Sequence, residues 1–243
     1  VRISVAGEPA AVVSVAVQPT AVSATGSSLE LESAPVAAGE STAVTIRTRD
    51  KFSNEVTAAV ANFTAVVKVV NATGSFETVP GTLEIVGAGE ARLSFTPELA
   101  GRHGVHVTVA GSGIHVSNSP AAVAVVAGPV SPPHSVIVGG RGGMIGKELS
   151  LEVVLMDAYG NPCSSTATAA VVVASITPGD RAASTVSAEA QVTQHEGTEA
   201  VAYAVSYHFG TLADSPQTDD LGLAGTKTIN ITVDGHALDA LSV

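Results

Sequence analysis

The chain has 243 residues, which is room for two domains of ordinary size. Hydrophobic residues make up 45% of it and aromatic residues only 3%, so disorder is excluded and the core must be mainly aliphatic. A formal charge of −11 with so few rings leaves no basic surface for phosphates, which argues against nucleic-acid binding. No apolar run reaches the about 18 residues of a membrane span, so we expect no membrane insertion within this segment.

The first residues predict a short strand that ends at a Gly-Glu-Pro turn. Residues 1–7 are interpreted as the last strand of a preceding repeat or as a linker, because Ala6-Gly-Glu-Pro9 is similar to Ala127-Gly-Pro129 in the later linker. The alternative is that they form the first strand of the domain that follows. Further along, short alternating or fully apolar runs recur between turns, and helical periodicity is weak throughout. This pattern is typical of a β-sandwich, and we expect about seven strands per domain.

Two turns with the same Asp-x-aromatic-x-Asn pattern follow strand patterns, 107 positions apart. The first is Asp50-Lys-Phe-Ser-Asn54, and the second is Asp157-Ala-Tyr-Gly160-Asn161. An Asp side chain can accept hydrogen bonds from backbone amides ahead of it, and Gly160 can adopt a positive φ. We therefore interpret both as structural turns. A calcium site is the alternative, but calcium needs 6–8 oxygens and neither stretch is rich in Asp.

A longer match shows that the chain contains an internal repeat. Residues 100–111 align with residues 224–235, and Val105 and Val107 fall on Ile229 and Ile231. The strict alternation predicts strands with these four side chains buried. We place one domain at residues 8–127 and the second at 128–243, joined by a Pro-rich linker. The second copy carries an insertion at residues 208–220, and insertions in repeats map to loops.

The residues that close the first copy resemble a filamin-type immunoglobulin-like repeat. The motifs that carry this resemblance are Leu93-Ser-Phe-Thr-Pro97, Ala100-Gly101, Val105-x-Val107, Gly111-x-x-Ile114, Ser119-Pro120 and Val123-x-Val125. Two positions depart from the family pattern, with His103 in place of Tyr and Ala121 in place of Phe. The second copy keeps Ala224-Gly225 and the Ile229/Ile231 strand but lacks the Ser-Pro motif.

This resemblance implies an all-β fold of two tandem immunoglobulin-like sandwiches, without catalytic activity and without a cofactor. Such repeats occur in cytoskeletal filamins and in plant and green-algal gamete-surface adhesion proteins. They build rods and bind protein partners, often as a strand added to an exposed edge. We accordingly expect a protein partner and neighbouring repeats of the same chain as the contacts of this segment.

Two kinds of residue bear on the compartment. Three glycosylation sequons begin at Asn62, Asn71 and Asn230, which favours a surface glycoprotein. Cys163 is the only cysteine, and a lone thiol is more ordinary in the cytoplasm. We predict an extracellular, cell-surface adhesion segment. The alternatives are an intracellular scaffold of the cytoskeleton or cilium and an accessory module of an extracellular enzyme.

Two surfaces are predicted to contact a partner. The insertion is acidic and partly apolar, and binding residues favour loops on rigid scaffolds. Its contact residues would be Phe209, Leu212, Asp214, Asp219 and Asp220. The rival is an open sheet edge along Phe63–Val70, centred on Val67, with the equivalent edge near Thr168–Ala174. Such Val-rich edges need covering by a partner, a neighbouring repeat or a glycan.

Overall fold

The structure is a computed structural model. It describes residues 2–5, 8–12, 16–31, 34–57, 59–70, 74–139, 148–163, 172–178, 191–195, 202–208, 227–238 and 241–242. These residues form β-strands and two single-turn 3-10 helices, with no α-helix among them, and the all-β prediction is confirmed. No helix in the described part of the chain is long and apolar enough to cross a membrane.

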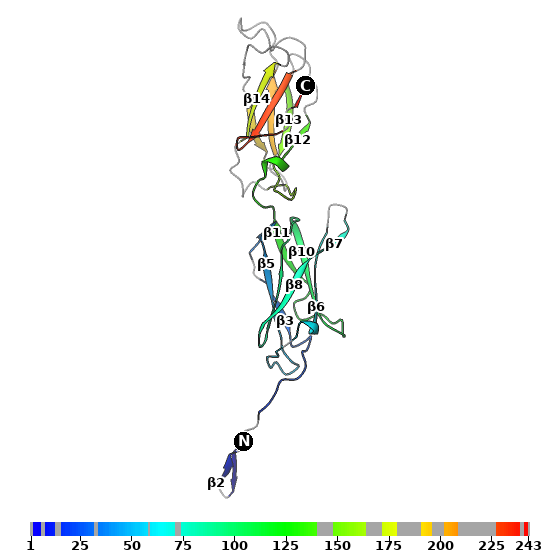
Figure 1. Cartoon of the computed structure of the whole chain (residues 1–243), viewed down its shortest axis with the longest axis vertical. Coiled ribbons are helices and arrows are strands. Elements are labelled where there is room, and N and C mark those ends of the chain that lie inside the picture. The colour runs from blue at the N-terminus through cyan, green and yellow to red at the C-terminus, as the bar shows by residue number, and fades with distance from the viewer. Residues whose placement is uncertain are drawn as a thin grey trace. The chain divides into compact units, whose positions relative to one another are not determined.

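The first half of the chain forms two facing sheets (Figure 1). One sheet has the strand order β3-β5-β9-β8, with bounds Ser28–Glu30, Thr42–Arg47, Glu90–Phe95 and Gly81–Gly87. The other has the order β4-β11-β10-β6-β7, with bounds Val36–Ala37, Ala121–Val126, Gly101–Val109, Phe63–Val70 and Phe76–Val79. Period-2 burial along β10 places Val105 and Val107 in the core between the sheets, as the sequence predicted.

The described strands of the second half repeat the four-stranded sheet and the central part of the other sheet. One sheet has the order β12-β13-β16-β15, with bounds Val136–Gly139, Glu148–Val154, Ala202–His208 and Gln191–His195. The other is built on β17, paired with β14, β18 and β19, with bounds Lys227–Val233, Val172–Pro178, His236–Ala237 and Leu241–Ser242. Ile229 and Ile231 are fully buried, as predicted.

Equivalent strands of the two halves have equivalent partners. β5 lies between β3 and β9 as β13 lies between β12 and β16. β10 pairs antiparallel with β6, and its matched strand β17 pairs antiparallel with β14. The segments that match in sequence therefore occupy the same positions in two sandwiches.

The remaining elements are short. β1 (Arg2–Val5) and β2 (Glu8–Val12) form a two-stranded hairpin, and the 3-10 helices are η1 (Val60–Asn62) and η2 (Pro132–His134). The expected domain boundary at residue 8 falls within this hairpin. The boundaries 1–7, 8–127 and 128–243 stay predictions.

The chain also divides into two compact units by its internal contacts. The first unit comprises Val1–Ala34, Ser41–Thr96 and Arg102–Val123, and the second comprises Pro35–Glu40, Pro97–Gly101 and Ala124–Val243. Two short loops that precede residue 127 in sequence thus pack with the later part of the chain. These loops are central to the candidate site below.

The expectation of an open edge centred on Val67 is wrong. β6 pairs with β10 along Phe63–Val69 and with β7 along Val67–Val70, and Val67 is 1% exposed. Val67 faces Val105 on one neighbouring strand and Val79 on the other. The edge of this sheet is β7, one strand further out.

Candidate functional site

In the first unit, the buried carboxylate of Asp50 organises the turn that follows β5. It accepts hydrogen bonds from the backbone amides of Phe52 (2.8 Å), Asn54 (2.9 Å) and Thr20 (3.0 Å). The Asn54 side-chain amide donates to it as well, at 3.0 Å. Ser53 takes a positive φ of 68°, which closes the turn.

In the second unit, Asp157 builds the same network. It accepts from the backbone amides of Tyr159 (2.8 Å), Asn161 (2.9 Å) and Gly128 (2.8 Å), and from the Asn161 side chain at 2.8 Å. Gly160 has a φ of 80°, the conformation predicted for it. Asp50, Asn54, Asp157, Gly160 and Asn161 thus have the places in structural turns that their spacing suggests.

Both carboxyl groups are held in the ionised form. Burial alone would raise the pKa of each, but hydrogen bonds from the Asn side chain and from backbone amides lower it by more. The net result is a pKa below the usual value for Asp50 and for Asp157. The lone pairs that a calcium ion would need are directed at N–H donors. Within the described ranges, no group of three or more His, Cys, Asp or Glu could hold a metal.

The second turn makes contacts beyond its own network. Asn161 is 5% exposed, its side-chain amide donates to the Glu98 carbonyl at 2.7 Å, and its Oδ1 accepts from the Ala100 amide at 2.8 Å. Tyr159 lies against Gly39, whose φ is +82°. A Cβ built on that glycine would come within 2.5 Å of the Tyr159 ring. All of these residues belong to the second unit.

The first turn exposes its asparagine and its aromatic side chain more than the second does, where Asn161 is 5% and Tyr159 44% exposed. Phe52 is 65% exposed, and the Lys51 ammonium lies 4.8 Å from the centre of its ring. Asn54 is exposed, and among the described residues its hydrogen bonds stay within the turn. The sequence predicts both turns but not this difference between them. The signal that it does carry is an aromatic residue in each turn, Phe52 and Tyr159, in a chain with few of them.

Cys163 follows the second turn and is fully buried. Burial, and after it the charge of Asp157, raises the pKa of the thiol to about 11. The thiol is therefore protonated at neutral pH, and a protonated, buried thiol is a poor nucleophile. Its place is that of a small core residue.

The sequons differ in their surroundings. Asn62 ends η1, is exposed, and accepts the Ala59 amide through Oδ1 at 2.7 Å. Asn230 lies on β17 and is partly exposed. Asn71 lies outside the described residues.

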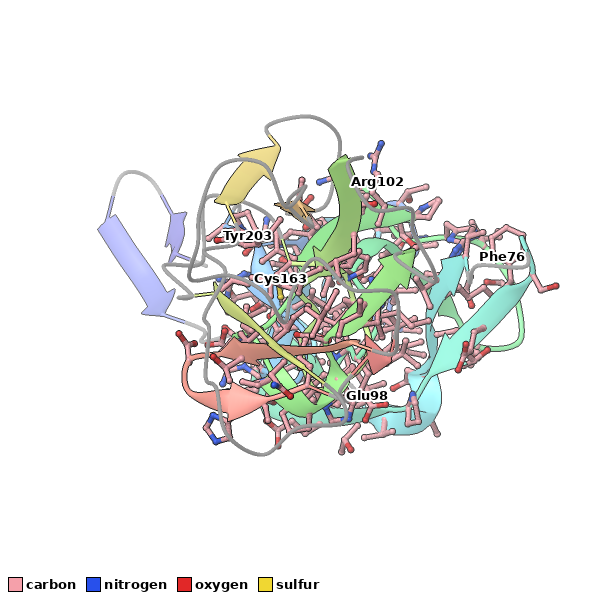
Figure 2. All side chains as sticks on the ribbon, turned by 90° about the horizontal axis from the view of Figure 1, so that it is seen from above. Phe76, Glu98, Arg102, Cys163 and Tyr203 are labelled. Carbon is pink, nitrogen blue, oxygen red and sulfur yellow. The ribbon has the colours of Figure 1, made fainter. Side chains whose placement is uncertain are left out.

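The predicted partner contacts lie in two places. Residues 209–220 of the insertion, with Phe209, Leu212, Asp214, Asp219 and Asp220, fall outside the described residues. On the sheet edge, β7 presents Phe76, which is 76% exposed and pairs with half-exposed Val70 on β6. Figure 2 shows the Phe76 side chain at the periphery of the first sandwich, away from its core.

Comparisons with known proteins agree with this fold. The Filamin/ABP280 repeat model matches residues 16–122. These residues form a filamin-type repeat. In this repeat, β10 (Gly101–Val109) carries His103 where the family pattern has Tyr. His103 is fully buried. In a comparison with curated protein sequences, none matches the chain.

Two solved structures are similar in fold to this chain. One is the Escherichia coli adhesin FdeC, with 22% identity and a TM-score of 0.53, over 92% of this chain and 65% of that one. The other is invasin, a bacterial integrin-binding protein, with 17% identity and a TM-score of 0.53, over 93% of this chain and 41% of that one. This chain thus spans less than two thirds of the length of either structure. At these identities the likeness is one of fold.

Proposed function

We propose that this chain is a non-catalytic structural and protein-interaction segment of a larger modular protein, and that it serves in a cell-surface adhesion ectodomain. One four-stranded sheet of each sandwich has the same strand order, as in a spacer built from repeated modules. FdeC is described as an adhesin and invasin as integrin-binding, and both contain sandwiches of this kind. The gamete-surface proteins named above would be one form of such a parent.

The observation that carries the surface location is the setting of Asn62. Its sequon runs through Thr64, and both residues are exposed at the start of β6. The hydrogen bond from Ala59 uses Oδ1, whereas a glycan is attached at Nδ2. A sugar can therefore be added without breaking the turn.

Secretory expression tests this proposal. The chain is produced through a eukaryotic secretory pathway, and peptides containing Asn62, Asn71 and Asn230 are analysed by mass spectrometry. We expect a glycan at Asn62 that Thr64→Ala abolishes. Unmodified asparagine at all three sites would count against the surface location.

The partner contact of this ectodomain is proposed for the insertion at 208–220. It adds three Asp to the second sandwich, which suits a basic partner. Deleting residues 210–219 changes loop-closure entropy only slightly, so folding should persist. Beads that carry the deletion variant should no longer attach to target cells. Beads that carry the intact chain should attach less as the salt concentration rises.

The competing contact is strand addition on β7. A proline in place of Thr78 would disturb the outer strand without touching the insertion. If this change removes attachment while the deletion leaves it intact, the contact is the β7 edge.

One observation favours an intracellular scaffold as a second candidate function. The filamin-type repeat of residues 16–122 is also the building block of cytoskeletal filamins, and Cys163 is an unpaired thiol. Burial protects that thiol in either compartment. The sequon experiment therefore decides between the two functions, whereas the state of Cys163 does not.

A further inference from the structure

The two Asp–Asn turns have the same hydrogen-bond network in different surroundings. In the second unit, the turn at Asp157–Asn161 lies against the loops Pro35–Glu40 and Pro97–Gly101. The contact has two parts, the Asn161 side chain bonded to a backbone carbonyl and amide, and the Tyr159 ring over Gly39. The two loops are themselves joined, because the Gly39 amide donates to the Pro97 carbonyl at 2.7 Å.

The turn at Asp50–Asn54 carries the same two groups in a more exposed state. Asn54 is exposed where Asn161 is 5% exposed, and Phe52 is 65% exposed where Tyr159 is 44% exposed. We propose that this turn is a docking surface for the end of another filamin-type sandwich. The docked end would present loops equivalent to Pro35–Glu40 and Pro97–Gly101.

The chain that leads into each turn supports this occupant. The amide of Thr20 donates to Asp50 as that of Gly128 donates to Asp157. Counting back from these two amides, Ala16-Val17 matches Ala124-Val125, which lie in β11 (Ala121–Val126). Val125 is 5% exposed in its sheet, whereas Val17 is 83% exposed. Val17 thus matches a residue of a strand. The sheet that this strand would join belongs to the docked sandwich.

Charge supports the same occupant. The position next to the aromatic residue is Ala158 in the second turn and Lys51 in the first. The loops that would dock carry two exposed acids, Glu40 and Glu98. A basic side chain at the rim of the first turn therefore complements the end of a sandwich of this type.

The proposal is independent of the adhesive function, since a spacer in any compartment could stack its repeats in this way. It is tested on the whole chain with residues 20–127 duplicated in tandem after residue 127. In that tandem chain, Thr20 of the second copy follows Ala127, as Gly128 does in the natural sequence. The Asp50 turn of the first copy stays open, and that of the second copy meets the loops of the first.

A single reporter distinguishes the two copies. The natural chain has no tryptophan, so Phe52→Trp in one copy gives an unambiguous signal. We expect a blue-shifted emission and weaker acrylamide quenching from the second copy than from the first. Adding Asn54→Ala should reverse the shift in the second copy and leave the first copy unchanged.

Phe52→Cys provides a second measurement with a smaller side chain, because Cys163 is buried and its thiol stays protonated. Labelling by a maleimide should be slower in the second copy. Equal emission, quenching and labelling in the two copies would overturn the proposal. So would a blue shift in the unduplicated chain that grows with protein concentration, since the loops Pro35–Glu40 and Pro97–Gly101 already contact the Asp157 turn there and a second molecule would have to bind by another surface.

Discussion

The turns at Asp50–Asn54 and Asp157–Asn161 have nearly the same hydrogen bonds around their aspartates, yet only the second has a covered asparagine. Asn161 is 5% exposed and reaches Glu98 and Ala100, whereas Asn54 is exposed. The aspartate network therefore suffices to form the turn. Whether the asparagine of the turn is covered depends on whether another loop supplies a carbonyl and an amide that bond to it.

The largest effect is expected from removing the aspartate of the covered turn. Asp157→Ala leaves the amides of Gly128 and Asn161 without an acceptor in a buried site, at a cost of about 3–5 kcal/mol. Asp50→Ala should cost less, because Thr20 and Asn54 are exposed and water can reach their amides. All three tyrosines lie in the second unit, so tyrosine fluorescence during urea unfolding follows the effect of Asp157→Ala. Amide hydrogen exchange in β10 of the first unit follows the effect of Asp50→Ala. A larger loss at Asp50 would contradict this comparison.

A core substitution tests whether the strands of the second unit face as described. Ile229→Ala should lower the free energy of unfolding by about 2–4 kcal/mol, because it removes buried methyl groups and leaves a cavity. Thr232→Ala on the partly exposed face of the same strand should cost less than about 1 kcal/mol. Equal losses in urea unfolding would show that the assigned faces are wrong.

Gly39 separates backbone strain from the contact with Tyr159. Gly39→Ala should cost about 1–2 kcal/mol for the left-handed backbone, and more because the ring must move. Gly111 also has a positive φ, +79°, but open space around it. The loss of stability in Gly111→Ala should therefore come from backbone strain alone. In a Tyr159→Ala background the excess at Gly39 should disappear. An excess that persists would mean that the ring does not cover this glycine.

Acid should weaken both turns gradually. Because the folded state lowers the pKa of both Asp50 and Asp157 from 3.8, the unfolded state binds protons first as the pH falls. Their stabilisation is complete at neutral pH and is lost as the pH drops below about 4 towards the folded pKa. Urea midpoints measured at several pH values should show this loss, and Asp157→Asn should reduce it in the tyrosine signal. A midpoint that is unchanged by acid would contradict the lowered pKa.

Local chemistry made the turns predictable from sequence, because each aspartate bonds to amides two and four residues ahead of it. The same holds for the buried face of Val105 and Val107, since alternation along a strand is local. The partners of Asn161 lie 61 and 63 positions away and are backbone groups, which leave no mark on the sequence. The edge along β6 was mispredicted for a related reason. The pairing of β7 with β6 depends on how the chain returns after residue 70.

The measurement that tests the account most directly is the pair Asn161→Ala and Asn54→Ala. Amide hydrogen exchange in β17 and β10 reports the opening of each unit separately. Asn161→Ala should lower the opening free energy in β17 by about 1–3 kcal/mol, since the Glu98 carbonyl and Ala100 amide lose their partner. Asn54→Ala should lower that of β10 by less than about 1 kcal/mol. Equal losses would contradict the claim that one turn is docked and the other open.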